Sequence, residues 1–246
     1  MRNLKMIAEY DGTAYHGWQR QRGHITIQQV LEESIGAITQ EDIKVIGSGR
    51  TDAGVHAANQ VANFMTGSHL GERNLLLGIN SMLPQDIAVK ELAETDLRFH
   101  ARFDAKSKIY TYQIWNESMR SPLYRHYAWH VRNFLAANRM REAAGRFIGT
   151  HDFSSFCAAN CGFHNHIRTV KRLDIDRDQR GMLTIDVEAD GFLKYMVRNM
   201  VGMLVDVGMG KRDPNEVTSV IEAKDRRQAA VTAPARGLFL REVRYS

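Results

Sequence analysis

The chain has 246 residues but only two cysteines, and no uninterrupted apolar run reaches the length that crosses a bilayer. Two cysteines argue against a disulfide scaffold and favour a reducing, cytoplasmic setting. The first residues run straight into a strand-like segment without the apolar core of a signal peptide. We therefore expect neither a membrane span nor a secretory signal.

Composition leaves room for a large folded core and for an anionic partner. Hydrophobic residues make up 43% of the chain, enough for one large domain or two small ones. Lysine and arginine number 33 against 28 acidic residues, and the pI is near 9.3. This basic balance is compatible with binding to a polyanion but does not require it.

Apolar periodicity predicts the element order β-α-β-β-α-β twice along the chain. The first half has strands at 4–10, 44–46, 60–64 and 87–92 and helices at 27–38 and 72–82. The second has strands at 108–115, 170–176, 183–189 and 238–245, helices at 135–147 and 194–207, and a shorter helix opened by Asp213 and Pro214. We predict an α+β fold of two ferredoxin-like, RRM-like halves, residues 1–104 and 105–246, whose antiparallel sheets flank a central active-site cleft.

One run of residues concentrates unusual chemistry: Gly47-Ser48-Gly49-Arg50-Thr51-Asp52-Ala53-Gly54-Val55-His56-Ala57. It places the carboxylate of Asp52 in a glycine-rich turn, where glycine permits positive φ and close approach of another molecule. The run lacks the glycine pattern of a dinucleotide fingerprint, the Gly-Lys-Ser/Thr of a P-loop and the serine of a nucleophile elbow. A nucleophile or charge-stabilising carboxylate fits the pattern, and a simple turn with Asp52 as its cap remains the alternative.

Together with other motifs in the same order, this run resembles the TruA-type tRNA pseudouridine synthases, and the resemblance covers nearly the whole chain. The matching segments are Tyr10-Asp11-Gly12-Thr13, Gly17-Trp18-Gln19, the Asp52 run, Asn80 with Leu83-Pro84 and Asp86-Ile87, Phe99-His100-Ala101-Arg102-Phe103, Tyr110-Thr111-Tyr112, Gly149-Thr150-His151-Asp152-Phe153, Phe192-Leu193 with Met196-Val197-Arg198, and Ala233-Pro234-Ala235-Arg236-Gly237-Leu238. Each motif is weak alone, but their common order is specific.

The resemblance implies an isomerase that converts uridine to pseudouridine at positions 38–40, on the 3′ side of the tRNA anticodon stem-loop. It implies no cofactor, no metal, and a homodimer that presents one tRNA to both subunits. By the same resemblance, Asp52 is the catalytic carboxylate and Arg198 its ion-pair partner, since a nearby cation keeps an aspartate charged.

Further roles also follow from the resemblance. Tyr110 stacks on the target base, Leu238 forms an apolar wall, and Arg50 is the wedge that replaces the flipped uridine in its stem. Arg20 and Arg22 lie in a loop that resembles a tRNA-gripping extension. Other basic groups are candidates for phosphate contacts: Lys106 with Lys108, Arg168 with Lys171 and Arg172, Lys211 with Arg212, and Arg226 with Arg227.

Two other interpretations stay open. Cys157, Cys161, His164 and His166 are zinc-ligand types, but their tight spacing fits no common structural zinc site, and we expect no metal.

A non-catalytic tRNA-binding or chaperone protein on the same scaffold is the alternative to an enzyme. The presence of Asp52, Tyr110 and Arg198 favours the enzyme. A phosphate-binding hydrolase would need a base or metal set that the glycine run lacks.

Overall fold

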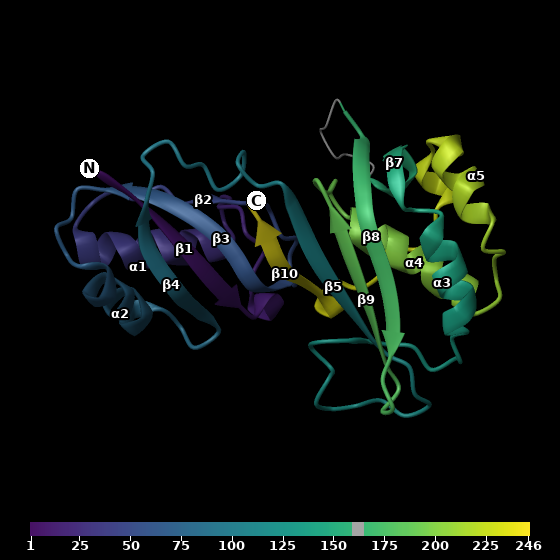
Figure 1. The fold of residues 1–246 in the computed structure, drawn as a ribbon. Helices are drawn as coiled ribbons and strands as arrows, with labels where there is room; N and C mark the ends of the chain where they lie inside the picture. Colours follow the sequence, from purple (N-terminus) through teal and green to yellow (C-terminus); the bar gives the residue numbers. More distant parts are fainter. Residues whose placement is uncertain (159–164) are drawn as a thin grey trace. The chain divides into compact units, whose positions relative to one another are not determined.

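A computed structural model describes residues 1–158 and 165–246, and the chain divides into two compact units (Figure 1). The first unit contains Met1–Lys106 and Phe239–Ser246, and the second contains Ser107–Leu238. Both combine helices with mostly antiparallel strands, so the predicted α+β class is confirmed. The prediction placed residues 239–246 in the second half, whereas here their strand pairs with a strand of the first unit.

The sheet of the first unit is built around its first strand, which pairs with another strand on each side. Its strands are β1 (Arg2–Tyr10), β2 (Ile46–Gly47), β3 (His56–Thr66), β4 (Ile87–Thr95) and β10 (Leu238–Arg244), and its helices are α1 (Ile27–Thr39) and α2 (Glu72–Met82). β1 is antiparallel to both β4 and β3. β3 also pairs with β2 in antiparallel and β10 in parallel orientation. The end of β1 therefore lies beside the start of β3.

The helices of this unit cover one side of its sheet (Figure 1). α1 buries Ile27, Leu31 and Ile35, which recur at helical spacing and form one apolar stripe. Thr26 caps the helix as predicted, because its side chain accepts a hydrogen bond from the backbone of Gln29. The predicted strands and helices of the first half are all present.

The second unit has a four-stranded antiparallel order, β5-β9-β8-β7, with β6 parallel to β5. The strands are β5 (Ser107–Trp115), β6 (Trp129–His130), β7 (Gly149–Asp152), β8 (Ile167–Arg177) and β9 (Met182–Ala189). The helices are α3 (Ala137–Gly145), α4 (Met196–Gly208) and α5 (Glu216–Ala223), and short 3₁₀ turns lie at Ser154–Phe156, Arg226–Gln228 and Ala235–Gly237. The hairpin predicted between β8 and β9 is confirmed, and the short β6 and β7 were not predicted.

Three helices, α3, α4 and α5, begin two residues later than predicted. α4 begins at Met196 and not at 194, because Tyr195 has a left-handed φ of 65°, which a right-handed helix cannot contain. α5 begins at Glu216 with Asn215 as its N-cap, so Asp213 is not the cap. Asp213 instead accepts a hydrogen bond from the backbone of Asn215 in the turn that precedes the helix. No helix in the described residues is long and apolar enough to span a membrane.

Arg226, which was predicted as a candidate for phosphate contact, points into the second unit. Arg226 donates hydrogen bonds to the carbonyls of Ala229 and Ala230, and also to the side chains of Asn199 and Thr232. Burial lowers the pKa of Arg226 below its ordinary value. Its guanidinium therefore holds the segment between α5 and β10 together.

Replacing Arg226 with methionine should lower the free energy of unfolding by about 1–3 kcal/mol, because the hydrogen bonds from its guanidinium to four acceptors are lost. Arg227→Met is the matched control, since that side chain is 88% exposed and forms an ion pair with Asp225. We expect the control to change stability by no more than about 0.5 kcal/mol. Urea unfolding of both variants measures the difference, and equal values would contradict an inward structural role for Arg226.

Candidate active site

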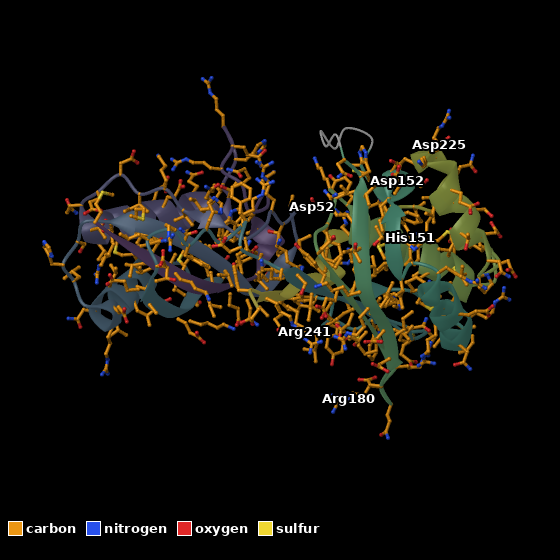
Figure 2. The ribbon with its side chains drawn as sticks, turned by 45° about the horizontal axis from the view of Figure 1, so that its top comes forward. Asp52, His151, Asp152, Arg180, Asp225 and Arg241 are labelled. Atoms are coloured by element: carbon orange, nitrogen blue, oxygen red, sulfur yellow. The ribbon has the colours of Figure 1, made fainter. Side chains whose placement is uncertain are left out.

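The carboxylate of Asp52 lies on the loop of residues 48–55, which connects β2 with β3 (Figure 2). The backbone N–H of Val55 donates to the carbonyl of Asp52 at 3.1 Å and closes a tight turn. Gly54 completes the turn with a φ of 76°, a conformation that favours glycine. Asp52 is half-buried, so the turn fixes its position and still leaves it accessible to a ligand.

Polar groups beneath the loop fix its first half. The hydroxyl of Tyr10 lies 2.8 Å from that of Thr51. Burial raises the pKa of Tyr10, so this hydroxyl stays protonated at neutral pH. The fully buried amide of Gln60 accepts from the hydroxyl of Ser48 at 2.7 Å and donates to the carbonyl of Gly49 at 2.9 Å. Two of these partners belong to β1 and β3, so the strands set the position of the loop.

The segment after β1 holds the loop from a second side. The backbone N–H of Trp18 donates to the carbonyl of Thr51 at 3.0 Å, and that of Gly54 donates to the carbonyl of Tyr15 at 3.2 Å. Gly17 has a φ of 82°, and a Cβ built on it would lie only 2.4 Å from the carbonyl oxygen of Thr51. Only glycine permits this approach of the two backbones.

A buried histidine connects the end of the loop to the end of β1. His56 Nδ1 lies 3.0 Å from a carboxylate oxygen of Asp11 and 3.1 Å from the backbone nitrogen of Gly12. Its ring stacks on Phe239 with the centroids 4.6 Å apart. A Cβ on Gly12 would lie 2.0 Å from the carbonyl oxygen of Val55, so this contact also requires glycine. The loop is therefore anchored at its beginning, middle and end.

The predicted basic residues of the first unit differ in their surroundings. Arg50 is exposed, and its Nε donates to the side chain of Gln19 at 3.1 Å. Arg20 forms an ion pair with the buried carboxylate of Glu32 at 2.9 Å, and this hydrogen bond raises the pKa of Arg20. Arg22 is exposed at the turn of the same loop. Arg20 thus has a structural partner, while Arg22 presents its charge to solvent.

Tyr110 is buried in β5 of the second unit. Its ring meets the edge of Phe192 at 5.1 Å between centroids. Tyr112 lies two residues further and therefore on the same face of the strand. The hydroxyl of Tyr112 donates to the carbonyl of Pro234 at 2.7 Å. This face of β5 thus meets both the segment before α4 and the segment before β10.

Two further predicted residues follow these segments in the chain: Arg198 in α4 and Leu238 at the start of β10. Arg198 is in the first turn of α4, where its Nε donates to the carbonyl of Ala233 at 2.8 Å. The backbone of Ala233 donates in return to the carbonyl of Arg198, and the guanidinium lies 4.7 Å from the ring centre of Tyr195. Leu238 is buried directly after the last 3₁₀ turn. Arg198 is thus tied to the segment before β10, which Tyr112 also contacts.

The predicted residues thus form two groups, one in each unit. Asp52 and Arg50 share the glycine-rich loop of the first unit. Tyr110, Arg198 and Leu238 lie in the second unit. The ion pair of Asp52 with Arg198 stays a prediction.

The metal interpretation concerns a segment that is only partly described. Cys161 and His164 lie outside the described residues. Cys157 is buried after a 3₁₀ turn, and the carbonyl of His166 accepts from the backbone of Phe153. In the described part of the chain, no three His, Cys, Asp or Glu side chains are placed to hold a metal ion.

Sequence reasoning assigned no role to the residues that anchor the Asp52 loop. Tyr10 and His56 belong to motifs that carry the family resemblance, and Gln60 is the first residue of the strand predicted at 60–64. The sequence shows Gln60 only as one of two polar residues, with Asn63, in the predicted strand at 60–64. Its partners Ser48 and Gly49 cannot be identified from spacing alone.

Comparison with known proteins identifies the class. A family model described as tRNA pseudouridine synthase matches residues 6–104 and 143–246. A protein of Acetivibrio thermocellus named tRNA pseudouridine synthase A is 44% identical over 245 residues, and one of Geotalea uraniireducens with the same name is 46% identical. Both alignments cover 100% of each chain. The chain therefore belongs to the tRNA pseudouridine synthase family, a class of isomerases, as its motifs predicted.

Among solved structures, the chain is similar to one titled "Crystal Structure of a Cbf5-Nop10-Gar1 Complex". The TM-score is 0.35 and the sequence identity 10%, and the match covers 82% of this chain and 54% of that chain.

Gly17→Ala should disturb the Asp52 loop more than Gly23→Ala does. Both glycines have positive φ, which costs an alanine about 1–2 kcal/mol, but a Cβ on Gly23 meets nothing within 4 Å. At Gly17 the Cβ collides with the backbone of Thr51, so we expect a further loss of about 1–3 kcal/mol. Urea unfolding measures both variants. Equal losses would show that close approach to the loop is not required.

Proposed function

We propose that this chain converts uridine to pseudouridine at positions 38–40 of tRNA, on the 3′ side of the anticodon stem-loop, with Asp52 as the catalytic carboxylate. The names of its full-length relatives support the substrate and the reaction. The observation that carries the proposal is the anchored loop, which holds a half-buried carboxylate by backbone and side-chain contacts from β1, β3 and the segment after β1.

The chemistry explains why one fixed carboxylate suits this reaction. The bond between N1 of uracil and C1′ breaks, the base turns, and a bond between C5 and C1′ forms while C5 loses its proton and N1 gains one. The reaction involves no net oxidation, so we propose that it needs neither a redox cofactor nor a metal. Asp52 either attacks C1′ or stabilises the positive charge that develops on the sugar. A carboxylate held on a stiff loop serves both routes, since it needs little reorganisation.

Side chains of the second unit complete the proposed site. Arg198 pairs with Asp52 and keeps the carboxylate ionised. Its donation to the carbonyl of Ala233 supports this role, because that contact limits where the guanidinium can lie. Tyr110 stacks on the target uracil and assists removal of the C5 proton, while Leu238 provides an apolar wall. The burial of Tyr110 and Leu238 supports defined positions for both side chains.

Basic residues of the first unit have proposed roles in opening and holding the RNA. A uridine in a stem is paired and stacked, so it must be flipped out at a cost of a few kcal/mol. Arg50, which is exposed on the Asp52 loop, fills the vacated space. Arg22 contacts phosphate, and Arg20 does so while it remains paired with Glu32.

The proposal extends to the arrangement and setting of the protein. The element order β1-α1-β2-β3-α2-β4 supports a ferredoxin-like first half, and β5-α3-β8-β9-α4 supports a related second half. The cleft between such halves stays a prediction. We propose a homodimer that binds one tRNA across both subunits, in the cytoplasm.

A tritium-release assay tests the reaction and its carboxylate together. The substrate is a tRNA transcript with uridine tritiated at C5, because pseudouridine formation releases that hydrogen and binding does not. Asp52→Asn keeps the shape of the side chain and removes its charge, so we expect release to fall by about 10³-fold or more. The dissociation constant for tRNA should stay near that of the wild type, since phosphate contacts position the RNA.

Asp42→Asn is the control for loss of a carboxylate, because that side chain is 86% exposed and forms an ion pair with exposed Lys44. It should release tritium at the wild-type rate. Near-normal release by Asp52→Asn would refute the assignment of Asp52. Tight tRNA binding without release by the wild type would favour the non-catalytic tRNA-binding alternative.

A further inference from the structure

A loop and a hairpin pack together at one end of the sheet of the second unit. The loop comprises residues 116–135 and the hairpin residues 177–182, and we call their exposed face the 116–135 surface. The backbone of Asn116 donates to the carbonyl of Gly181, and its side chain accepts from Arg177 at 2.6 Å. Arg177 also donates to the carbonyl of Leu135. These contacts give the loop a defined conformation.

An aromatic ring stands out from this surface. Phe134 is 75% exposed, although its neighbour Leu135 is fully buried. The guanidinium of Arg177 lies 5.4 Å from the ring centre, which holds the ring from one side. Beside it is a cavity of about 330 Å³, lined by Phe134, Leu135, Ala136, Ala137, Asn138 and Arg177. An exposed ring beside a guanidinium and an open apolar cavity suits a flat, aromatic ligand such as a nucleobase.

The charge of the surface is mainly positive. Exposed arginines lie on both parts of it: Arg120, Arg125, Arg132 and Arg180. Figure 2 shows Arg180 at the tip of the hairpin, directed away from the ribbon. Of the two acidic residues, Asp178 already accepts backbone hydrogen bonds from Arg180 and Met182. Several exposed arginines on the same loop and hairpin as an exposed ring complement a polyanion that carries bases.

The same charges argue against a second copy of the chain as the occupant. A two-fold interface brings the same patch of both subunits together, so arginines on this surface would face arginines. Position also favours RNA. The loop begins directly after Trp115, five residues along β5 from Tyr110, or about 17 Å at the rise of a strand. An RNA that reaches Tyr110 is large enough to reach this surface as well.

We infer that the 116–135 surface is a second RNA contact, at which an unpaired base of the tRNA stacks on Phe134 and the arginines bind neighbouring phosphates. The inference rests on the proposed function for the identity of the RNA. The loop of this surface lies between the two stretches that the family model matches, whereas the hairpin lies within the second stretch.

Equilibrium binding of a full-length tRNA transcript tests the contact without requiring catalysis. Phe134→Ala should raise the dissociation constant about tenfold, within the range that base stacking on an aromatic side chain gives. Phe134→Tyr keeps a ring and should bind like the wild type. Arg180→Gln should reduce the slope of log affinity against log salt concentration by about 1.

Leu77→Ala is the matched control, because it removes an apolar side chain that is 59% exposed on α2 of the first unit. It should leave tRNA binding unchanged. Phe134→Ala binding within twofold of the wild type would overturn the inference. Sedimentation of each variant gives the second test: a dimer that dissociates on Phe134→Ala would assign the surface to a second copy instead.

Tritium release, measured on the same samples, separates this inference from the proposed function. We expect Phe134→Ala to raise KM for full-length tRNA and to leave kcat unchanged, because the ring contacts a base other than the uridine that reacts. If the wild type binds tRNA through Phe134 but releases no tritium, the proposed reaction fails and the second contact stands. If release is normal and Phe134→Ala changes neither binding nor KM, the second contact fails and the reaction stands.

Discussion

The close approach of two backbone segments is the constraint on which the candidate site depends. Residues 11–18, at and after the end of β1, lie directly against the loop of residues 48–55, and two backbone hydrogen bonds join them through Trp18 and Gly54. Side chains at Gly12 and Gly17 would collide with carbonyl oxygens of the loop. The absence of a Cβ at these two positions therefore determines where the carboxylate can lie.

This constraint gives the carboxylate of Asp52 a defined position before any RNA binds. A short side chain on an anchored turn loses little conformational freedom when it engages a substrate. The second unit also positions its side chains by close contacts to backbone. The Nε of Arg198 donates to the carbonyl of Ala233, and the backbone at Gly237 packs closely on the ring of Tyr112. Each unit therefore holds its candidate side chains by contacts to backbone.

Much of the fold could be predicted from periodicity, because alternation in the first part of β9 and helical spacing in α1 record which side faces the core. The start of α4 could not, since the left-handed φ of Tyr195 leaves no mark in the spacing. The candidate residues came from motifs, but their supports did not. Tyr10 binds a hydroxyl 41 residues away, and Arg226 turns inward to meet Asn199, 27 residues before it. Such partners depend on tertiary packing, which one sequence does not reveal.

Hydrogen exchange of the free protein tests most directly whether the Asp52 loop is ordered in advance. The amides of Ser48, Gly54 and Val55 each donate to a carbonyl, so they should exchange slowly without tRNA, at rates close to those of neighbouring β3 amides. The exposed turn at Gly23 provides the fast reference within the same protein. Exchange of the loop amides as fast as that turn, with protection only after tRNA is added, would contradict a site that the fold itself positions.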